Sequence, residues 1–170
     1  MAIGERWIPA YVGLGSNLDD PHARVKQGFD ALQSLPETKL VARSALWESP
    51  PMGPIEQPDF VNAVAGLLTR LSPQAMLVEL KLLEEKLGRE RPVARWGPRR
   101  IDFDLLVLGS SVIDDPELVL PHSGIAERPF VLLPLAEIAP DLQVPGLGTI
   151  RQLLEQLDTS RMRRMESSVE

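Results

Sequence analysis

The fold of this chain is decided by residues 95–108, which read Arg-Trp-Gly-Pro-Arg-Arg-Ile-Asp-Phe-Asp-Leu-Leu-Val-Leu. The apolar composition from Ile101 to Leu108 is typical of a β-strand. Side chains alternate between the two faces of a strand, so we expect Asp102 and Asp104 to share one face. Two carboxylates on one face predict a Mg²⁺ site, because magnesium is usually held by one or two carboxylates together with substrate phosphates.

Arginines are concentrated just before this strand, in a chain whose formal net charge is −6. A local basic segment in an acidic protein indicates a specific anionic ligand rather than a nucleic-acid surface. The alternative is a solvated cluster of ion pairs, which would contribute little to stability. Asp-x-Asp alone does not decide between the two interpretations. The basic side chains are those of Arg89, Arg91, Arg95, Arg99 and Arg100.

The elements that precede this strand predict an α+β fold. Asp20-Pro21 and Ser72-Pro73 are typical helix starts, with a capping side chain followed by proline at the first helical position. We expect strands at 8–14, 40–47, 60–69 and 101–108, and helices at 21–35 and 73–88. The order β-α-β-β-α-β is that of the ferredoxin-like fold, with an antiparallel sheet and both helices on one face. The other face and its loops are then available for a site.

Beyond residue 108 we expect C-terminal additions to this core. They are a short strand at 112–113, a helix within 125–133 and a last helix at about 149–157. The chain of 170 residues fits a single domain over residues 1–170, with a core at about 8–158 and a loose tail at 159–170.

The composition excludes several classes of protein. The chain has no cysteine and only two histidines, which argues against disulfides, thiolate metal sites and histidine-based zinc sites. We expect a cytoplasmic protein without a membrane partner, because no apolar run is long enough to cross a bilayer. Gly13-Leu14-Gly15 resembles the start of a dinucleotide-binding loop, but Leu18 stands where the third glycine is required, and there is no Walker motif.

A proline-rich segment at residues 48–62 contains four prolines and is expected to be stiff. The prolines can act only by reducing the entropy of the unfolded chain. They can equally hold a loop in shape for a flat ligand at little ordering cost. Aromatic rings and an amide could complete such a pocket by stacking a planar heterocycle and matching its polar edge, although each ring alone could also be core. The candidates are Phe60, Asn62, Trp96 and Phe130.

The stretch from Trp96 to Leu106 closely resembles the signature of the 6-hydroxymethyl-7,8-dihydropterin pyrophosphokinase family. The resemblance extends to Gly15-Ser16-Asn17, to the proline-rich segment, to Pro121-His122 and to Arg128 with Phe130, and it covers about residues 11–142. It implies a ferredoxin-like enzyme of folate biosynthesis. Such an enzyme transfers the pyrophosphoryl group of ATP to the hydroxymethyl oxygen of the pterin and releases AMP.

The resemblance also implies roles for individual residues. Two Mg²⁺ ions are expected on Asp102 and Asp104, with Arg89 and Arg99 as further catalytic residues. The pterin is expected to contact Ser49, Pro50, Met52, Phe60, Asn62, Trp96 and Phe130. ATP, as co-substrate, is expected to contact Lys81, Arg89, Arg91, Arg95, Trp96, Arg99, Leu105, His122 and Arg128. Glu84 matches a carboxylate that is usual in the family, without a firm role.

The departures from the family pattern fall on the ATP side, at Lys81, Glu117, Val119 and Ser123. They leave open a non-catalytic paralogue that binds a pterin or a nucleotide. An RNA-binding module on a ferredoxin-like sheet is a third possibility, which the sequence pI of about 5.0 disfavours. We therefore expect a monomer whose partners are small molecules, not nucleic acid.

Overall fold

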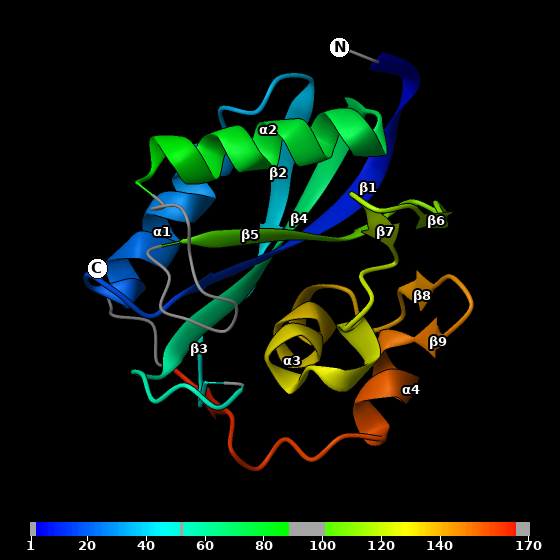
Figure 1. Ribbon diagram of the computed structural model, residues 1–170. Helices are drawn as coiled ribbons and strands as arrows, with labels where there is room; N and C mark the ends of the chain where they lie inside the picture. The colour runs from blue at the N-terminus through cyan, green and yellow to red at the C-terminus, as the bar shows by residue number, and fades with distance from the viewer. Residues whose placement is uncertain (1–2, 52, 89–100, 166–170) are drawn as a thin grey trace.

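A computed structural model describes residues 3–51, 53–88 and 101–165, and it is built on one central antiparallel sheet. Figure 1 shows α1 and α2 on one side of this sheet and α3 on the other. The strand order is β10-β3-β4-β1-β5, and β2 also pairs with β4. The sheet strands are β1 (Ile3–Ser16), β2 (Thr38–Arg43), β3 (Trp47–Ser49), β4 (Phe60–Leu71), β5 (Asp102–Leu108) and β10 (Arg163–Arg164). The helices are α1 (Pro21–Leu32), α2 (Pro73–Lys86), the 3-10 turn η1 (Ile125–Glu127), α3 (Pro129–Ile138) and α4 (Ile150–Glu155).

The first two helices begin where the capping residues predict. The Asp20 carboxylate accepts a hydrogen bond from the Ala23 N–H at 3.3 Å, and the Ser72 hydroxyl accepts one from the Ala75 N–H at 3.1 Å. Each capping side chain provides an acceptor for a backbone N–H that the first turn leaves without an intrahelical partner. Both helices bury an apolar stripe against the sheet, consisting of Val25, Phe29 and Leu32 in α1 and Met76, Leu80 and Leu83 in α2.

Alternation along the central strands divides the core into two layers. Ala10, Val12 and Leu14 of β1 pack with the residues of α1 and α2, whereas Tyr11 packs with those of α3. The second layer is centred on Val64 and Leu106 of the sheet and on Leu132 and Leu135 of α3. Each face of the sheet therefore has its own apolar cover.

The two core helices share one face of the sheet as expected, but the expectation that the other face is left open is wrong where α3 packs. The expected helix within 125–133 becomes η1 followed by α3, which continues to Ile138. Val131, Leu132, Pro134 and Leu135 are all buried, so nearly every side of this helix is apolar. Such a helix is stable only under cover, and the sheet face that carries Val64 provides it. Part of the face expected to be left for a site is thus occupied.

The strand expected at 40–47 is divided into β2 and β3. Ser44 lies at the break, where its backbone N–H donates to the Val64 carbonyl at 2.9 Å and its hydroxyl accepts from the Val64 N–H at 2.8 Å. The side chain thus replaces a backbone partner, and β3 continues the pairing along β4 beyond the break. The expectation of a loose tail at 159–170 is wrong for Arg163 and Arg164, because β10 pairs with β3.

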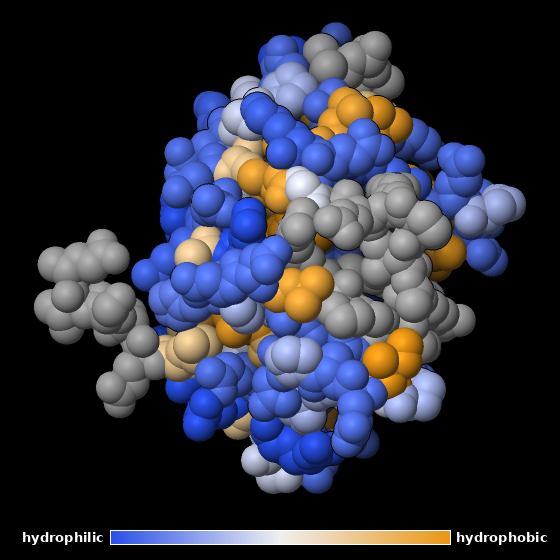
Figure 2. Space-filling model, turned by 60° about the vertical axis from the view of Figure 1, so that its left-hand side comes forward, coloured by the Kyte–Doolittle hydropathy of each residue, from blue (hydrophilic) through white to orange (hydrophobic). Residues whose placement is uncertain are grey.

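Short hairpins complete the C-terminal half. They are β6 (Ile113–Asp114) with β7 (Val119–Leu120), and β8 (Gln143–Val144) with β9 (Gly148–Thr149). Figure 2 shows a mostly hydrophilic surface with separate apolar patches. None of the helices in the described ranges is long and apolar enough to cross a membrane.

Candidate functional site

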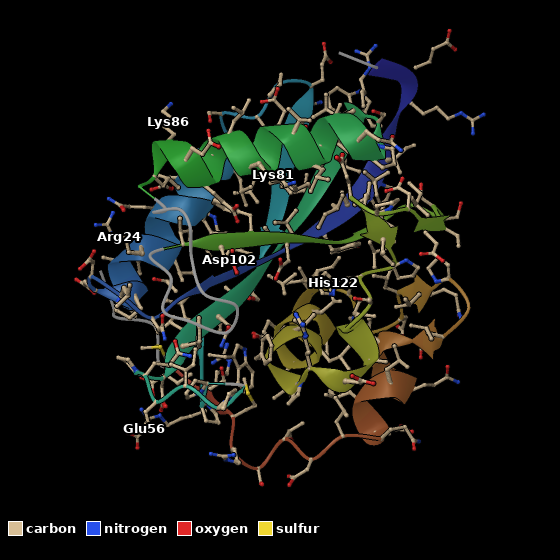
Figure 3. The ribbon with its side chains drawn as sticks, in the orientation of Figure 1. Arg24, Glu56, Lys81, Lys86, Asp102 and His122 are labelled. Atoms are coloured by element: carbon tan, nitrogen blue, oxygen red, sulfur yellow. The ribbon has the colours of Figure 1, made fainter. Side chains whose placement is uncertain are left out.

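Asp102 and Asp104 lie at the start of β5, as the sequence predicts. Phe103 between them is 6% exposed and packs in the layer of α1 and α2, while both aspartates are half-buried. Because neighbouring side chains point to opposite faces of a strand, both carboxylates lie on the α3 side of the sheet. Figure 3 shows Asp102 on β5, with the α2 helix on one side of this strand and His122 on the other.

Glycines stand opposite both aspartates on β1. Gly13 pairs with Asp104, and Gly15 pairs with Asp102 on one side and with Asn62 of β4 on the other. A Cβ atom at Gly15 would lie 3.4 Å from Asn62 Oδ1 and 3.9 Å from the Phe60 ring. No side chain of β1 therefore separates Asp102 from Asn62. The glycines that failed as a dinucleotide-binding motif instead keep this strip of the sheet open.

The amide of Asn62 is held from the neighbouring strand. Its Nδ2 donates to the Ser49 hydroxyl at 2.7 Å, and the side chains of both residues are buried. This bond fixes the orientation of the amide, as a group that recognises a ligand edge requires.

The proline-rich segment is attached to the end of β1. Asn17 Nδ2 donates to Gln57 Oε1 at 2.8 Å and to the Pro58 carbonyl at 2.9 Å. Asn17 is itself 2% exposed, so the anchor is internal. The segment is thus connected to the same strand that carries Gly15.

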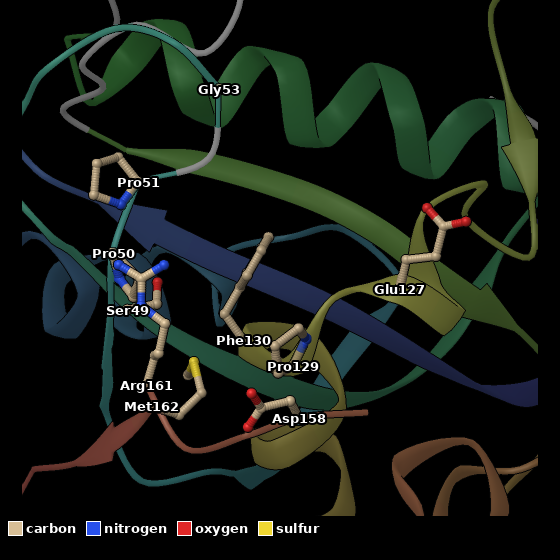
Figure 4. Close-up of a pocket in the computed structure, with 10 residues that line it drawn as sticks. All are labelled: Ser49, Pro50, Pro51, Gly53, Glu127, Pro129, Phe130, Asp158, Arg161 and Met162. Carbon is tan, nitrogen blue, oxygen red and sulfur yellow. The ribbon is translucent and has the colours of Figure 1, made fainter. Parts of the chain in front are cut away.

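A cavity of about 320 Å³ opens beside this strip. Ser49, Pro50 and Pro51 line it from the end of β3, and Phe130 lines it from α3 (Figure 4). Residues from the end of the chain also line it, namely Asp158, Arg161 and Met162. The family resemblance predicts Ser49, Pro50 and Phe130 but not Pro51. No sequence signal marks the second group, because the pairing that brings this segment to β3 joins residues far apart in the chain.

His122 and Arg128 form the basic side of the site. The Arg128 guanidinium lies 5.8 Å from the centre of the Phe130 ring, and a Cβ at Gly124 would collide with it at 2.5 Å. Burial, and then the charge of Arg128, lower the pKa of His122 to about 4, while Asp102 acts in the opposite direction. His122 is therefore neutral near pH 7. Its Nδ1 accepts the Gly124 N–H at 3.1 Å, which leaves the ring proton on Nε2 as a donor.

The chemistry of these donors fits magnesium. Hard carboxylate oxygens on one face suit an ion that keeps several waters and shares its coordination with phosphates. Within the described ranges no cluster of three or more histidine, cysteine, aspartate or glutamate side chains is positioned to hold a metal, so an all-protein cage is not offered there. Asp102 and Asp104 are accordingly the residues that could hold the ion.

Two of the expected ATP contacts are placed elsewhere. The Leu105 side chain is 5% exposed and packs in the core with α1 and α2, so it does not line an open site. Lys81 is exposed on α2, which packs on the sheet face opposite α3 (Figure 3). The remaining candidates lie outside the described residues, and they are Met52, Arg89, Arg91, Arg95, Trp96 and Arg99.

Taken together, the described residues can bind a flat ring in the cavity and a metal-complexed phosphate beside the carboxylates. Comparison with known proteins supports a site of this kind. The family model for 7,8-dihydro-6-hydroxymethylpterin-pyrophosphokinase (HPPK) matches residues 11–140. The chain belongs to this family.

Curated relatives cover nearly the whole chain. A 2-amino-4-hydroxy-6-hydroxymethyldihydropteridine pyrophosphokinase from Pseudomonas aeruginosa is 47% identical over 144 residues, 85% of this chain and 88% of the relative. A protein of the same name from Methylorubrum extorquens is 45% identical over 157 residues, 92% of this chain and 98% of the relative.

A solved structure shares the fold at much lower identity. The crystal structure of a Plasmodium falciparum HPPK-DHPS variant with pteroate matches with a TM-score of 0.74 at 16% identity. The match covers 94% of this chain, which spans about half of that protein, 47% of its length. This likeness supports the fold alone.

Proposed function

We propose that this protein transfers the pyrophosphoryl group of ATP to the hydroxymethyl oxygen of 6-hydroxymethyl-7,8-dihydropterin, giving the pterin diphosphate and AMP, in folate biosynthesis. The observation that carries the proposal is the open row from Asp102 across Gly15 to Asn62. It allows a metal-bound phosphate and the edge of a heterocycle to bind on the same face of one sheet. Membership of the HPPK family supports the same reaction.

The fold proposed for this activity is a ferredoxin-like core with additions. The order β5-β1-β4-β2, with α1 and α2 on one face, supports it. The additions are β3 and β10 at one edge, together with η1, α3 and α4. We expect residues 1–170 to form a single domain and a monomer, which light scattering after size exclusion would test.

The pterin is proposed to stack between Phe60 and Phe130. Asn62 reads the pyrimidinone edge, and backbone groups at Ser49, Pro50 and Met52 add contacts. The cavity beside Phe130 and the hydrogen bond from Asn62 to Ser49 support this arrangement. A ring held between two others gains stacking energy in addition to burial, which suits a flat substrate. Trp96 is proposed to close over the pocket.

Asp102 and Asp104 are proposed to hold two Mg²⁺ ions. When bound, the ions neutralise phosphate oxygen charge and orient the reacting groups. Phosphoryl transfer needs positioning and charge stabilisation more than covalent help from the protein. The protein's further contribution is therefore a set of hydrogen-bond donors and positive charges around the phosphates. His122 donates a hydrogen bond from its Nε2–H to a phosphate oxygen, and the Arg128 guanidinium donates to phosphate oxygens as well. Arg89, Arg91, Arg95 and Arg99 are proposed to add positive charge.

The test is a direct assay for AMP. The protein is incubated with MgATP and 6-hydroxymethyl-7,8-dihydropterin, and the nucleotides are separated by chromatography. We expect AMP to appear together with pterin diphosphate, and EDTA in excess to abolish both. Binding of both substrates by calorimetry without AMP formation would favour the non-catalytic paralogue instead. A gel-shift series with RNA that shows no shift across salt concentrations would dispose of the RNA-binding alternative.

A further inference from the structure

We propose that the turn and strand at residues 158–165 form a wall of the pterin pocket that determines how tightly the pterin binds. This C-terminal segment lines the same cavity as Ser49 and Phe130 through Asp158, Arg161 and Met162 (Figure 4). The inference rests on the proposed function, because it names further residues for the same substrate site.

The segment is held in place by backbone pairing. In β10, Arg163 pairs with Glu48 and Arg164 with Trp47 of β3, and the Met165 N–H donates to the Leu46 carbonyl at 2.8 Å. The strand β3 then continues directly into Ser49, whose hydroxyl accepts from Asn62. One hydrogen-bonded path therefore connects the C-terminal segment to the amide proposed to read the pterin.

Side-chain pairs reinforce this attachment from α3. Glu137 accepts the Trp47 indole N–H at 2.5 Å through one oxygen and pairs with the Arg164 guanidinium at 3.3 Å through the other. Arg163 forms an ion pair with Glu48. Exposed ion pairs contribute little on their own, so these contacts orient the strand while the backbone pairing holds it.

A tight turn directs the segment toward the cavity. The Asp158 carboxylate accepts the Ser160 N–H at 2.9 Å, and the Met162 N–H donates to the Thr159 carbonyl at 3.0 Å. Arg161 and Met162 are the last two residues of this turn, and β10 follows directly. Both side chains suit a planar ligand, since a thioether adapts to an apolar ring face and a guanidinium stacks on one.

The first test measures pterin binding in full-length single variants. Met162→Ala and Arg161→Ala should raise the Kd and KM for 6-hydroxymethyl-7,8-dihydropterin roughly tenfold, the order expected when a pocket loses one well-packed group. The KM for MgATP and the melting temperature should stay as in the wild type. Arg151→Ala is the matched control, because this exposed arginine pairs with Asp141 and lies outside the cavity lining.

A second test uses two truncations. A chain that ends at Met165 should bind pterin as the full chain does, whereas one that ends at Leu157 should bind it more weakly while circular dichroism still reports the sheet. If the shorter chain does not fold, the pterin affinities of Met162→Ala and Arg161→Ala decide whether the proposal holds.

Unchanged pterin affinity in both point variants would overturn the proposal that residues 158–165 help to bind the pterin. Equal rises of KM for both substrates, together with a lower melting temperature, would also overturn it, because they indicate a merely structural role. Absence of AMP from a wild-type protein that binds pterin would instead overturn the proposed function. The two failures are thus distinguishable.

Discussion

The Glu84 carboxylate accepts a hydrogen bond from the backbone N–H of Phe103 at 2.7 Å. This bond ties α2 to β5 between the two aspartates, and Glu84 is only 3% exposed. A buried carboxylate with this partner fixes where the strand begins, and therefore where Asp102 and Asp104 are presented on the opposite face. The sequence marked Glu84 only through resemblance, whereas the structure gives it a contact.

Removing that acceptor should destabilise the protein. In Glu84→Ala the Phe103 N–H loses the partner that Glu84 provides, and we expect a loss of about 1–3 kcal/mol in the free energy of unfolding. Glu84→Gln keeps a carbonyl oxygen and should lose less. Urea unfolding followed by circular dichroism measures both. Equal stability of Glu84→Ala and the wild type would contradict a positioning role.

Replacing either metal-binding candidate should affect catalysis and not stability. Asp102→Ala and Asp104→Ala each remove a half-buried carboxylate without creating a core cavity. We expect the rate of AMP formation to fall by roughly a thousandfold, since one charge-stabilising group contributes several kcal/mol. The exposed Asp114 of β6 provides the control variant Asp114→Ala. A collapse of the fold in the Asp102 and Asp104 variants would favour the ion-pair interpretation.

Filling the gap at Gly15 should weaken pterin binding at no cost in stability. The new methyl group of Gly15→Ala would touch Asn62 Oδ1 at 3.4 Å and the Phe60 ring at 3.9 Å. These are ordinary contacts in the free protein, but the methyl occupies space that a ligand needs. We expect the pterin Kd to rise about tenfold. Gly4→Ala lies at the other end of β1, where a Cβ would be 3.8 Å from the Arg70 carbonyl oxygen, and this variant should bind pterin normally.

The lowered pKa of His122 predicts a pH dependence of folding. The ring titrates near its ordinary value of 6.5 when the chain is unfolded and at about 4 when it is folded. Between these values the unfolded state binds more protons, so stability should fall as the pH decreases from about 6.5 to about 4. In His122→Asn, whose amide oxygen can still accept the Gly124 N–H, the slope should be shallower. Thermal melts across this pH range measure the difference.

The sequence predicts those elements whose signals are local. Asp20 and Ser72 each combine a capping side chain with a following proline, which predicts the start of a helix, and both capping hydrogen bonds form. The alternation at Asp102, Phe103 and Asp104 predicts their faces in the same way. Each of these signals depends on neighbours within about four positions, so no tertiary contact is needed to recognise it.

The remaining features depend on contacts between distant residues. The break at Ser44 exists because its hydroxyl reaches Val64 of another strand, and β10 exists because β3 offers an open edge. The burial of Val131, Leu132, Pro134 and Leu135 in α3 likewise requires the sheet face on which the helix packs. For the same reason no local sequence pattern predicts that Arg161 and Met162 line the cavity.

The pairing of β10 with β3 also affects the order in which the molecule is completed. Glu48 and Arg163 are 115 positions apart, so the pairing of β10 with β3 closes a longer loop than any other strand pair in the described part of the sheet. Chains fold from the N-terminus during synthesis, and contacts between distant residues form late. The sheet and its first helices can assemble while the ribosome is still adding residues. The cavity gains the wall formed by Asp158, Arg161 and Met162 only after the residues of β10 have been translated.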